Sequence, residues 1–306
     1  MVETRGVLRH DCLMCGGSCQ GVKVPLLNEG EHKRIAEQAV MLGVEEPVVD
    51  GVLRRVNGRC VFLGDDQLCR IHAKWGLLSK PTVCRQYPLV ATRVGDETRV
   101  GLDPGCFTSV KTWKTGPLVP AGALIASTSG FPDTVTQMEA QVLALLDGQD
   151  TVAGALGALT RSPSTSPWPH AFLERWFVAL RGIGLHELLA DPDTSPSLTN
   201  SLGGLAQALN EGIPPTQLIV LSSEAEAFAL DAAQRMVWLR LCTQVPAPAV
   251  TAMLSLAGAV SCAWAHPHDV AAFGQALAGW LRAIRSPSVL GRLLPSPTAL
   301  RVLIEG

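Results

Sequence analysis

The sequence lacks a strong excess of charge of either sign. Residues 1–114 hold 16 lysines and arginines against 13 acidic residues, whereas the remainder holds 9 against 14, and no lysine follows Lys114. Proteins that bind nucleic acid through its phosphates need a basic surface, commonly with aromatic side chains interleaved. The sequence has no such stripe and therefore predicts no nucleic-acid partner.

Secretory and membrane signals are also missing. Met1 to Asp11 is polar and holds no apolar run of the kind found in a secretory signal. Val245–Ala265 is about long enough to cross a bilayer, which takes roughly 20 residues. It is nevertheless rich in Ala, Gly and Ser, contains two prolines and lacks a basic flank, so a buried core helix is expected there. We expect a cytoplasmic protein with no membrane partner, whose thiols stay reduced.

Short motifs of the common enzyme classes are missing as well. No G-x-G-x-x-G follows an expected strand, which removes the support for a Rossmann dinucleotide site or a class I S-adenosylmethionine site. There is no P-loop, no G-x-S-x-G and no H-E-x-x-H. Nothing outside the cysteines indicates a nucleophile, so the sequence leaves any catalytic residue unknown.

What the chain does contain is cysteine, concentrated near one end. Seven of its nine cysteines lie in the first 106 residues, beginning with a C-x2-C-x3-C knot that encloses Gly16-Gly17. Thiolates this dense favour a soft or borderline metal, because sulfur is polarisable and one short loop can deliver several ligands. Cys242 and Cys262 stand in apolar helical contexts and are expected to be buried structural thiols. The predicted metal ligands are Cys12, Cys15, Cys19, Cys60, Cys69, Cys84 and Cys106.

The number of thiols leaves the kind of metal centre open. Two closed four-cysteine zinc sites need eight thiolates, whereas a single four-cysteine site or one iron–sulfur cluster needs four. A mixed site that uses His72 or an acidic oxygen would suit zinc or dinuclear iron. Iron, including an iron–sulfur cluster, and zinc therefore stand as equal alternatives.

The segments around the later cysteines occur in a specific order. A C-x-F-L segment begins at Cys60, a C-x-I-x segment begins at Cys69, and Pro81–Pro88 reads P-x-x-C-R-x-Y-P before Pro-Gly-Cys106. Together with the knot, this order resembles the CxxCxxCC cysteine-cluster family, also called YkgJ-type, which is described as zinc- or iron-chelating. The resemblance covers about the first third of the chain and implies a metal centre there.

The resemblance has one departure and two consequences. Ser18 stands where the family has its third knot cysteine, so a ligand is missing or comes from Cys106, His10 or His72. Arg85 follows Cys84 in the family segment and is predicted to bind a cofactor, by neutralising the thiolate cluster or holding a carboxylate; its structural alternative is to bond carbonyls in the turn.

Three functions remain open. The first is a metal-binding protein whose helical part binds a partner or a protein substrate. The second follows from the flagellin lysine N-methylases, which look like longer relatives of the family and imply iron–sulfur and S-adenosylmethionine-dependent methyl transfer to protein lysines. The third is an exported, disulfide-stapled binding module.

The expected fold class is α+β, with a cysteine-cluster domain over residues 1–114 and an α-helical bundle over 115–306. In the first part, Asn28 is expected to cap a helix over Glu29–Leu42. Short strands are expected over Gly58–Leu63 and Gln67–His72, and a hairpin over Pro88–Val94 and Thr98–Leu102. The expected helices of the second part are Thr134–Leu146, Pro169–Leu189, Thr199–Leu209, Ser223–Cys242, Ala249–Ala265, His268–Ile284 and Pro295–Ile304.

Overall fold

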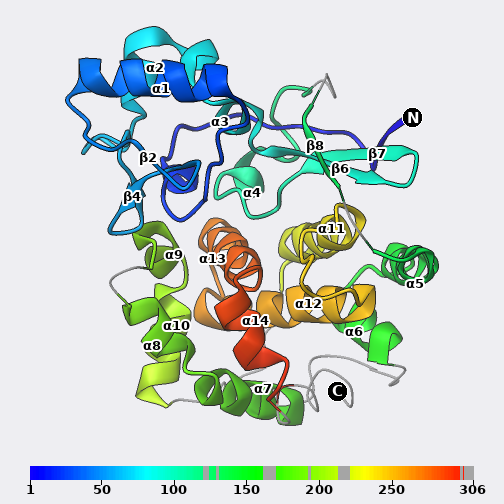
Figure 1. Ribbon diagram of the computed structural model, residues 1–306. Coiled ribbons are helices and arrows are strands. Elements are labelled where there is room, and N and C mark those ends of the chain that lie inside the picture. The colour runs from blue at the N-terminus through cyan, green and yellow to red at the C-terminus, as the bar shows by residue number, and fades with distance from the viewer. Residues whose placement is uncertain are drawn as a thin grey trace.

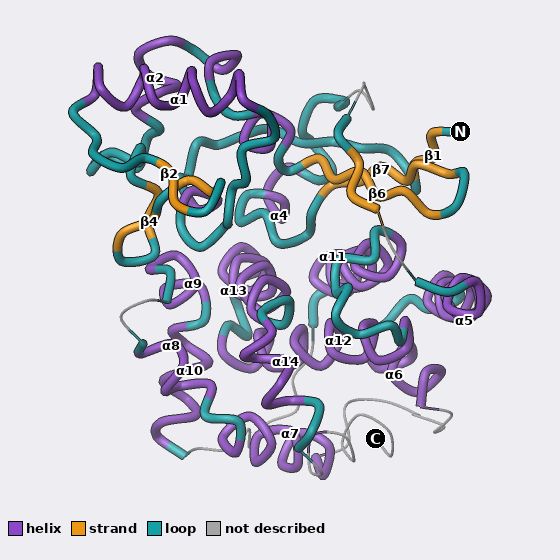
Figure 2. Tube along the Cα trace, in the orientation of Figure 1, coloured by secondary structure: helices purple, strands orange, loops and turns teal. Residues whose placement is uncertain are grey.

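A computed structural model of the protein describes residues 1–119, 124–128, 131–160, 170–191, 194–212, 221–296 and 299. Strands and short helices make up the N-terminal part and longer helices the rest, which confirms the α+β class (Figures 1 and 2). The N-terminal elements are β1 (Val2–Thr4), the 3₁₀ turn η1 (Gly17–Cys19), α1 (Glu29–Leu42), β2 (Val48–Val49), β3 (Val52–Leu53), β4 (Arg55–Val56), β5 (Arg59–Cys60), α2 (Arg70–Trp75), the 3₁₀ turn η2 (Leu77–Ser79), α3 (Thr82–Gln86), β6 (Leu89–Val94), β7 (Glu97–Leu102) and α4 (Ser109–Thr112).

Helix α1 has the bounds that the sequence predicts. The Asn28 side chain accepts a hydrogen bond from the Glu31 N–H at 3.0 Å, and Gly43 ends the helix in the left-handed conformation. Ile35 and Ala39 are buried, one turn apart on a single face. They pack in a small core with residues of the surrounding loops, so α1 covers one side of the cysteine-bearing segment.

The predicted hairpin is also confirmed. Strands β6 and β7 pair antiparallel around Gly95-Asp96, and they form the centre of a four-stranded sheet in the order β1-β7-β6-β8. The two edge strands, β1 and β8 (Ala126–Thr128), pair in parallel and were not expected. Strand β8 comes after residue 114, where the sequence predicts a domain boundary, yet it pairs with β6 of the N-terminal sheet. The boundary at residue 114 stays a prediction.

One predicted strand is wrong. Gln67–His72 does not form a strand; a single bridge joins Leu63 to Cys69, and helix α2 begins at Arg70. The apolar residues Ile71 and Trp75 are four apart and pack into the same small core, so a helical turn buries both together. Of the other predicted strand, Gly58–Leu63, Arg59–Cys60 forms strand β5, and Leu63 contributes only the single bridge to Cys69.

The second part is helical. Four of the expected helices are present with shifted ends, whereas Pro169–Leu189 is divided at Gly184, a left-handed residue, and Thr199–Leu209 is divided at Leu202. Helices α6 and α14 were not expected, and of the predicted helix Pro295–Ile304 residues 297–298 and 300–304 lie outside the described residues. The helices are α5 (Asp133–Asp147), α6 (Val152–Thr160), α7 (His170–Gly182), α8 (Leu185–Ala190), α9 (Pro196–Ser201), α10 (Gly203–Glu211), α11 (Ser223–Trp238), α12 (Pro248–Ala265), α13 (Val270–Ala283) and α14 (Pro287–Leu293).

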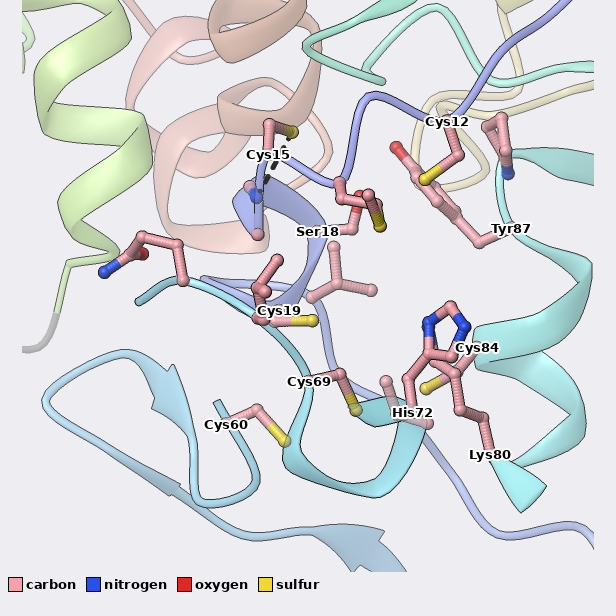
Figure 3. Close-up of a pocket in the computed structure, with 18 of the residues that line it drawn as sticks. Cys12, Cys15, Ser18, Cys19, Cys60, Cys69, His72, Lys80, Cys84 and Tyr87 are labelled. Carbon is pink, nitrogen blue, oxygen red and sulfur yellow. Dashed lines mark hydrogen bonds between the residues drawn. The ribbon is translucent and has the colours of Figure 1, made fainter. Parts of the chain in front are cut away.

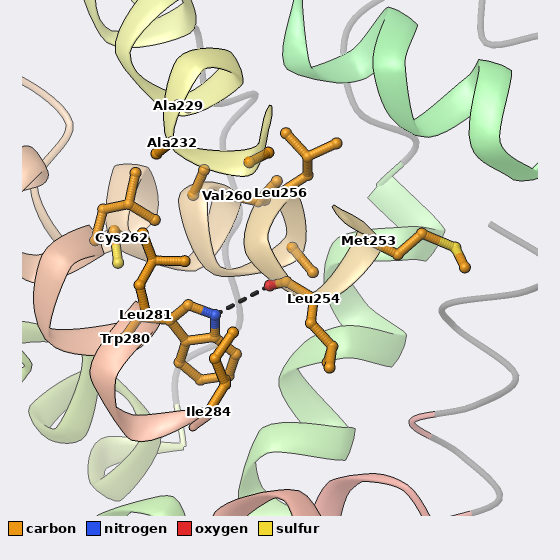
Figure 4. Packing of buried hydrophobic residues seen from close by; sticks show 14 of the residues in the cluster. Ala229, Ala232, Met253, Leu254, Leu256, Val260, Cys262, Trp280, Leu281 and Ile284 are labelled. Atoms are coloured by element: carbon orange, nitrogen blue, oxygen red, sulfur yellow. Dashed lines mark hydrogen bonds between the residues drawn. The ribbon is translucent and has the colours of Figure 1, made fainter. Parts of the chain in front are cut away.

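Helix α12 lies at the centre of the helical core (Figure 4). It is the one helix of the described residues that is long and apolar enough to cross a membrane, and 78% of it is buried inside the fold. Trp280 of α13 packs against it and donates its indole N–H to the Leu254 carbonyl at 3.0 Å. The expected core helix is therefore present, and Cys242 and Cys262 are buried as expected.

Helix α13 also joins the two parts of the chain. It lies beside the N-terminal part in Figure 1, and its Gly274 approaches α4 so closely that an added Cβ would lie 2.2 Å from Val110 Cγ2. Just beyond the helix, Arg285 makes a bidentate ion pair with Asp103, with distances of 2.6 and 2.8 Å. These contacts fix the last turn of α13 next to the cysteine-bearing loops.

Candidate metal centre

The seven N-terminal cysteines all line one cavity of about 320 Å³. They reach it from separate short elements, which Figure 3 shows converging from several sides. Cys12 and Cys15 precede η1, Cys19 ends it, Cys60 ends β5, Cys69 caps α2, Cys84 lies on α3, and Cys106 follows β7. The cavity thus brings together every residue that the sequence predicts as a metal ligand.

Exposure divides these cysteines into three groups. Cys12 and Cys15 are exposed, and Cys106 is buried with its sulfur 3.4 Å from the Thr108 hydroxyl. The remaining four are partly buried and are called the inner cysteines: Cys19, Cys60, Cys69 and Cys84. All nine cysteines of the chain are free, which favours a metal over a disulfide staple.

Electrostatics identifies the same inner group. Burial is the largest cause that raises the pKa of Cys60 to about 12, and the charges of Cys19 and Cys69 contribute to this rise. The pKa of Cys84 is likewise raised to about 12, mainly by burial and also by the charges of the other three inner cysteines, although Lys80 opposes the rise. These four sulfurs therefore interact with one another.

The other three cysteines of the cavity, Cys12, Cys15 and Cys106, differ from the inner four in their electrostatic interactions. Cys12 and Cys15 act on the pKa of Cys19, which burial raises first and Cys69 next. The pKa of Cys106 is raised by burial alone, and its hydrogen bonds to Thr108 and Ser109 and the charge of Arg282 lower it. No other cysteine contributes to the shift of Cys106, so this thiol stands apart from the inner group.

The loop before Cys19 depends on two glycines. Gly16 adopts a left-handed conformation with φ of 65°, and the Gly17 N–H points at the Cys15 sulfur at 3.4 Å. A Cβ on Gly17 would lie 2.3 Å from the Phe107 ring, so only glycine fits there without a shift. An N–H directed at sulfur is a contact that stabilises a thiolate ligand.

The donor chemistry of the cavity fits a thiophilic metal, because thiol sulfur is its commonest polar group. Among the residues that the structure describes, however, no three His, Cys, Asp or Glu side chains stand close enough to hold an ion as placed. To bind a metal ion, the short elements that carry the inner cysteines would have to move closer together, so that the distances between their sulfur atoms decrease.

Comparison with known proteins agrees with the chemistry of the cavity. Residues 11–106 match the family model CxxCxxCC, "Putative zinc- or iron-chelating domain", and the match includes all seven cysteines of the cavity. After this match, residues 11–106 are called the CxxCxxCC domain here. No curated protein and no solved structure is similar enough to the chain to count as a match.

Within the CxxCxxCC domain, the other predicted site residues are placed unequally. His72 lines the cavity, but from helix α2 and not from the expected strand. His10 also lines it; its Nδ1 lies 3.2 Å from the Thr112 hydroxyl, and burial lowers its pKa. Arg85 is exposed, is not among the residues that line the cavity, and donates to the Thr82 hydroxyl at 2.7 Å. Its position therefore agrees with a structural role better than with cofactor binding.

Two cationic residues at the domain, Lys80 and Arg282, were not predicted from the sequence. Lys80 lines the cavity, and its position directly before the Pro81–Pro88 segment is the sequence feature that could have indicated it. Arg282 comes from α13 and donates to the Gly17 carbonyl and to the hydroxyls of Ser18 and Tyr87. No sequence signal could identify Arg282, because it lies 265 residues from Gly17.

Proposed function

We propose that the protein binds iron or zinc through its CxxCxxCC domain, with Cys19, Cys60, Cys69 and Cys84 as the inner ligands. The observation that carries this proposal is the convergence of seven cysteines, from separate elements, on one cavity. The family description, zinc- or iron-chelating, supports the same function independently.

The choice of the inner four rests on burial and electrostatics. Each of these thiols is partly buried, and the pKa shifts of Cys19, Cys60 and Cys84 each include charges of other members of the group. A cation at their centre would stabilise the thiolates that burial and mutual repulsion now disfavour, because metal binding requires deprotonated sulfur. Four thiolates complete a structural zinc site or the ligand set of an iron–sulfur cluster.

Anaerobic purification, followed by metal analysis and an absorbance spectrum, tests the proposal. We expect stoichiometric metal per chain. A brown protein with broad thiolate-to-iron charge transfer identifies iron, and a colourless protein with zinc identifies a structural zinc site. A protein that carries neither metal, and takes up neither when it is offered under reducing conditions, would contradict the proposal.

The methyltransferase alternative depends only on the resemblance to flagellin lysine N-methylases. It predicts that S-adenosylmethionine raises the melting temperature of the metal-loaded protein by mass action. An unchanged melting temperature at millimolar S-adenosylmethionine would contradict this alternative but would not contradict metal binding. We also propose that the helical part binds a protein partner or substrate. A cytoplasmic location is a further proposal.

A further inference from the structure

Ser197 and Arg282, both of the helical part, donate to the cysteine knot. The Ser197 hydroxyl of α9 donates to the Gly17 carbonyl at 3.3 Å, and Arg282 of α13 makes the larger set of contacts. Its Nη1 donates to the Gly17 carbonyl at 2.9 Å, and its Nη2 donates to the Tyr87 hydroxyl at 3.0 Å and to the Ser18 hydroxyl at 3.3 Å. The guanidinium also lies 4.2 Å from the centre of the Phe107 ring. One planar side chain therefore ties together three segments of the N-terminal part of the chain.

The hydrogen-bond partners of Arg282 are all neutral. Among the described residues, no carboxylate lies within ion-pairing distance of Arg282, and the neighbouring Asp103 is paired with Arg285. Lys80, which lines the cavity, likewise has no ion-pair partner in the part of the chain that the structure describes. Lys80 thus stands beside the inner thiols, and Arg282 stands beside the cysteine knot and Cys106, where it shares the charge of Asp103 with Arg285.

The charge of the proposed metal centre matches these cations. A divalent ion with four thiolates has a net charge of about −2, which is costly in a partly buried site unless positive groups lie near it. Ser18, which Arg282 contacts, stands at the position of the third knot cysteine in the CxxCxxCC pattern. This chain therefore has a hydroxyl bound to a guanidinium at a position where the pattern has a thiolate.

We propose that Arg282 is a positioning residue of the metal centre: it holds the loop from Gly16 to Cys19 in place and supplies positive charge at the Ser18 position. The metal affinity of the CxxCxxCC domain then depends on the helical part, through the last turn of α13. This inference rests on the proposed function. It also gives the helical part a defined role, which is to complete the centre.

Titration of the metal-free, reduced full-length protein with Co²⁺, and then competition with Zn²⁺, tests the inference. Thiolate complexes of Co²⁺ absorb visible light, so the spectrum reports both the affinity and the ligand set. We expect Arg282→Gln to weaken the affinity about 10- to 100-fold, as losses of outer-shell partners of metal ligands do. Arg282→Lys keeps the charge but loses the planar fork, and its affinity should be intermediate.

Arg292→Gln is the matched control. Arg292 also donates to a backbone carbonyl, that of Ile183 at 3.1 Å, but it lies on α14 outside the residues that line the cavity. This variant should bind Co²⁺ like the wild type. Equal affinities of Arg282→Gln and the wild type, or an equal loss in Arg292→Gln, would overturn the inference.

Circular dichroism of the metal-free variants shows whether each one folds. If Arg282→Gln does not fold, Arg282→Lys and Ser18→Ala carry the test, because Ser18→Ala removes one acceptor and leaves α13 intact. Unchanged affinity in both would then contradict the inference. A wild-type protein that binds neither Co²⁺ nor Zn²⁺ would contradict the proposed function itself, so the two failures are distinguishable.

Discussion

At the scale of single residues, the cysteines of the cavity differ in their surroundings. Cys60 and Cys84 combine burial with neighbouring thiols, whereas Cys12 is exposed on the loop before η1. Cys242 lies in the helical core, where its sulfur faces the Ile284 carbonyl at 3.8 Å. Identical side chains thus lie in three kinds of surroundings: partly buried in the cavity, exposed at the knot, and buried in the helical core.

This division predicts how serine substitutions change metal content. Cys60→Ser or Cys84→Ser should lose most of the bound metal and also lower the melting temperature, because site formation and folding are coupled. Cys12→Ser should keep most of the metal. Metal analysis of the folded fraction measures the result, with Cys242→Ser as the control that keeps all of it. A greater loss in Cys12→Ser than in Cys60→Ser would refute the inner set.

At the scale of elements, the local signals in the sequence differ in how much they specify. Helix α1 has a cap, a left-handed glycine at its end and one buried face, and all of these are local, so its bounds could be predicted. The sequence predicts a strand where helix α2 forms, because the six residues of this helix are too few to display a helical period. Its type is decided by the core into which Ile71 and Trp75 pack.

The cap of α1 is therefore a testable element. Asn28→Ala removes the acceptor of the Glu31 N–H and should lower the free energy of unfolding by about 1 kcal/mol. Asn28→Asp keeps an acceptor at the same place and should retain most of the stability. Urea denaturation of the three proteins at the same metal occupancy measures the difference. Equal stability of the alanine and wild-type proteins would show that the cap contributes nothing.

At the scale of the whole molecule, buried ion pairs hold the N-terminal and helical parts together. Asp103 and Arg285 form one such pair, and Arg99 with Glu139 forms another. Burial alone would raise the pKa of Asp103, but the charge and hydrogen bonds of Arg285 dominate and leave it below its usual value. The pair therefore couples the position of α13 to the protonation of a carboxyl in the CxxCxxCC domain.

The sign of the pH dependence follows from that lowered pKa. Asp103 contributes stability above its unfolded pKa of about 3.9, and the contribution is lost as the pH falls through the lower folded pKa. At neutral pH, Asp103→Asn should cost about 3–5 kcal/mol, because it leaves Arg285 without its charge partner.

Urea unfolding of the wild type and of Asp103→Asn between neutral pH and the acid limit tests this prediction. The stability difference between the two proteins should narrow as the pH falls below about 4. Asp50→Asn, a change at an exposed residue, should leave the curve unchanged. A difference that stays constant with pH would show that the charge of Asp103 does not stabilise the fold.

The sequence by itself determined the donor chemistry of this protein: seven thiols in an order that matches the CxxCxxCC family, together with α1 and the β6–β7 hairpin. Spacing, caps and alternation are local properties, so they can be recognised in one dimension. The tertiary structure decided that all seven thiols line one cavity and that Arg282 reaches Ser18. Those relations join residues up to 265 positions apart, and only the packing of α13 against the cysteine-bearing loops brings them within hydrogen-bonding distance.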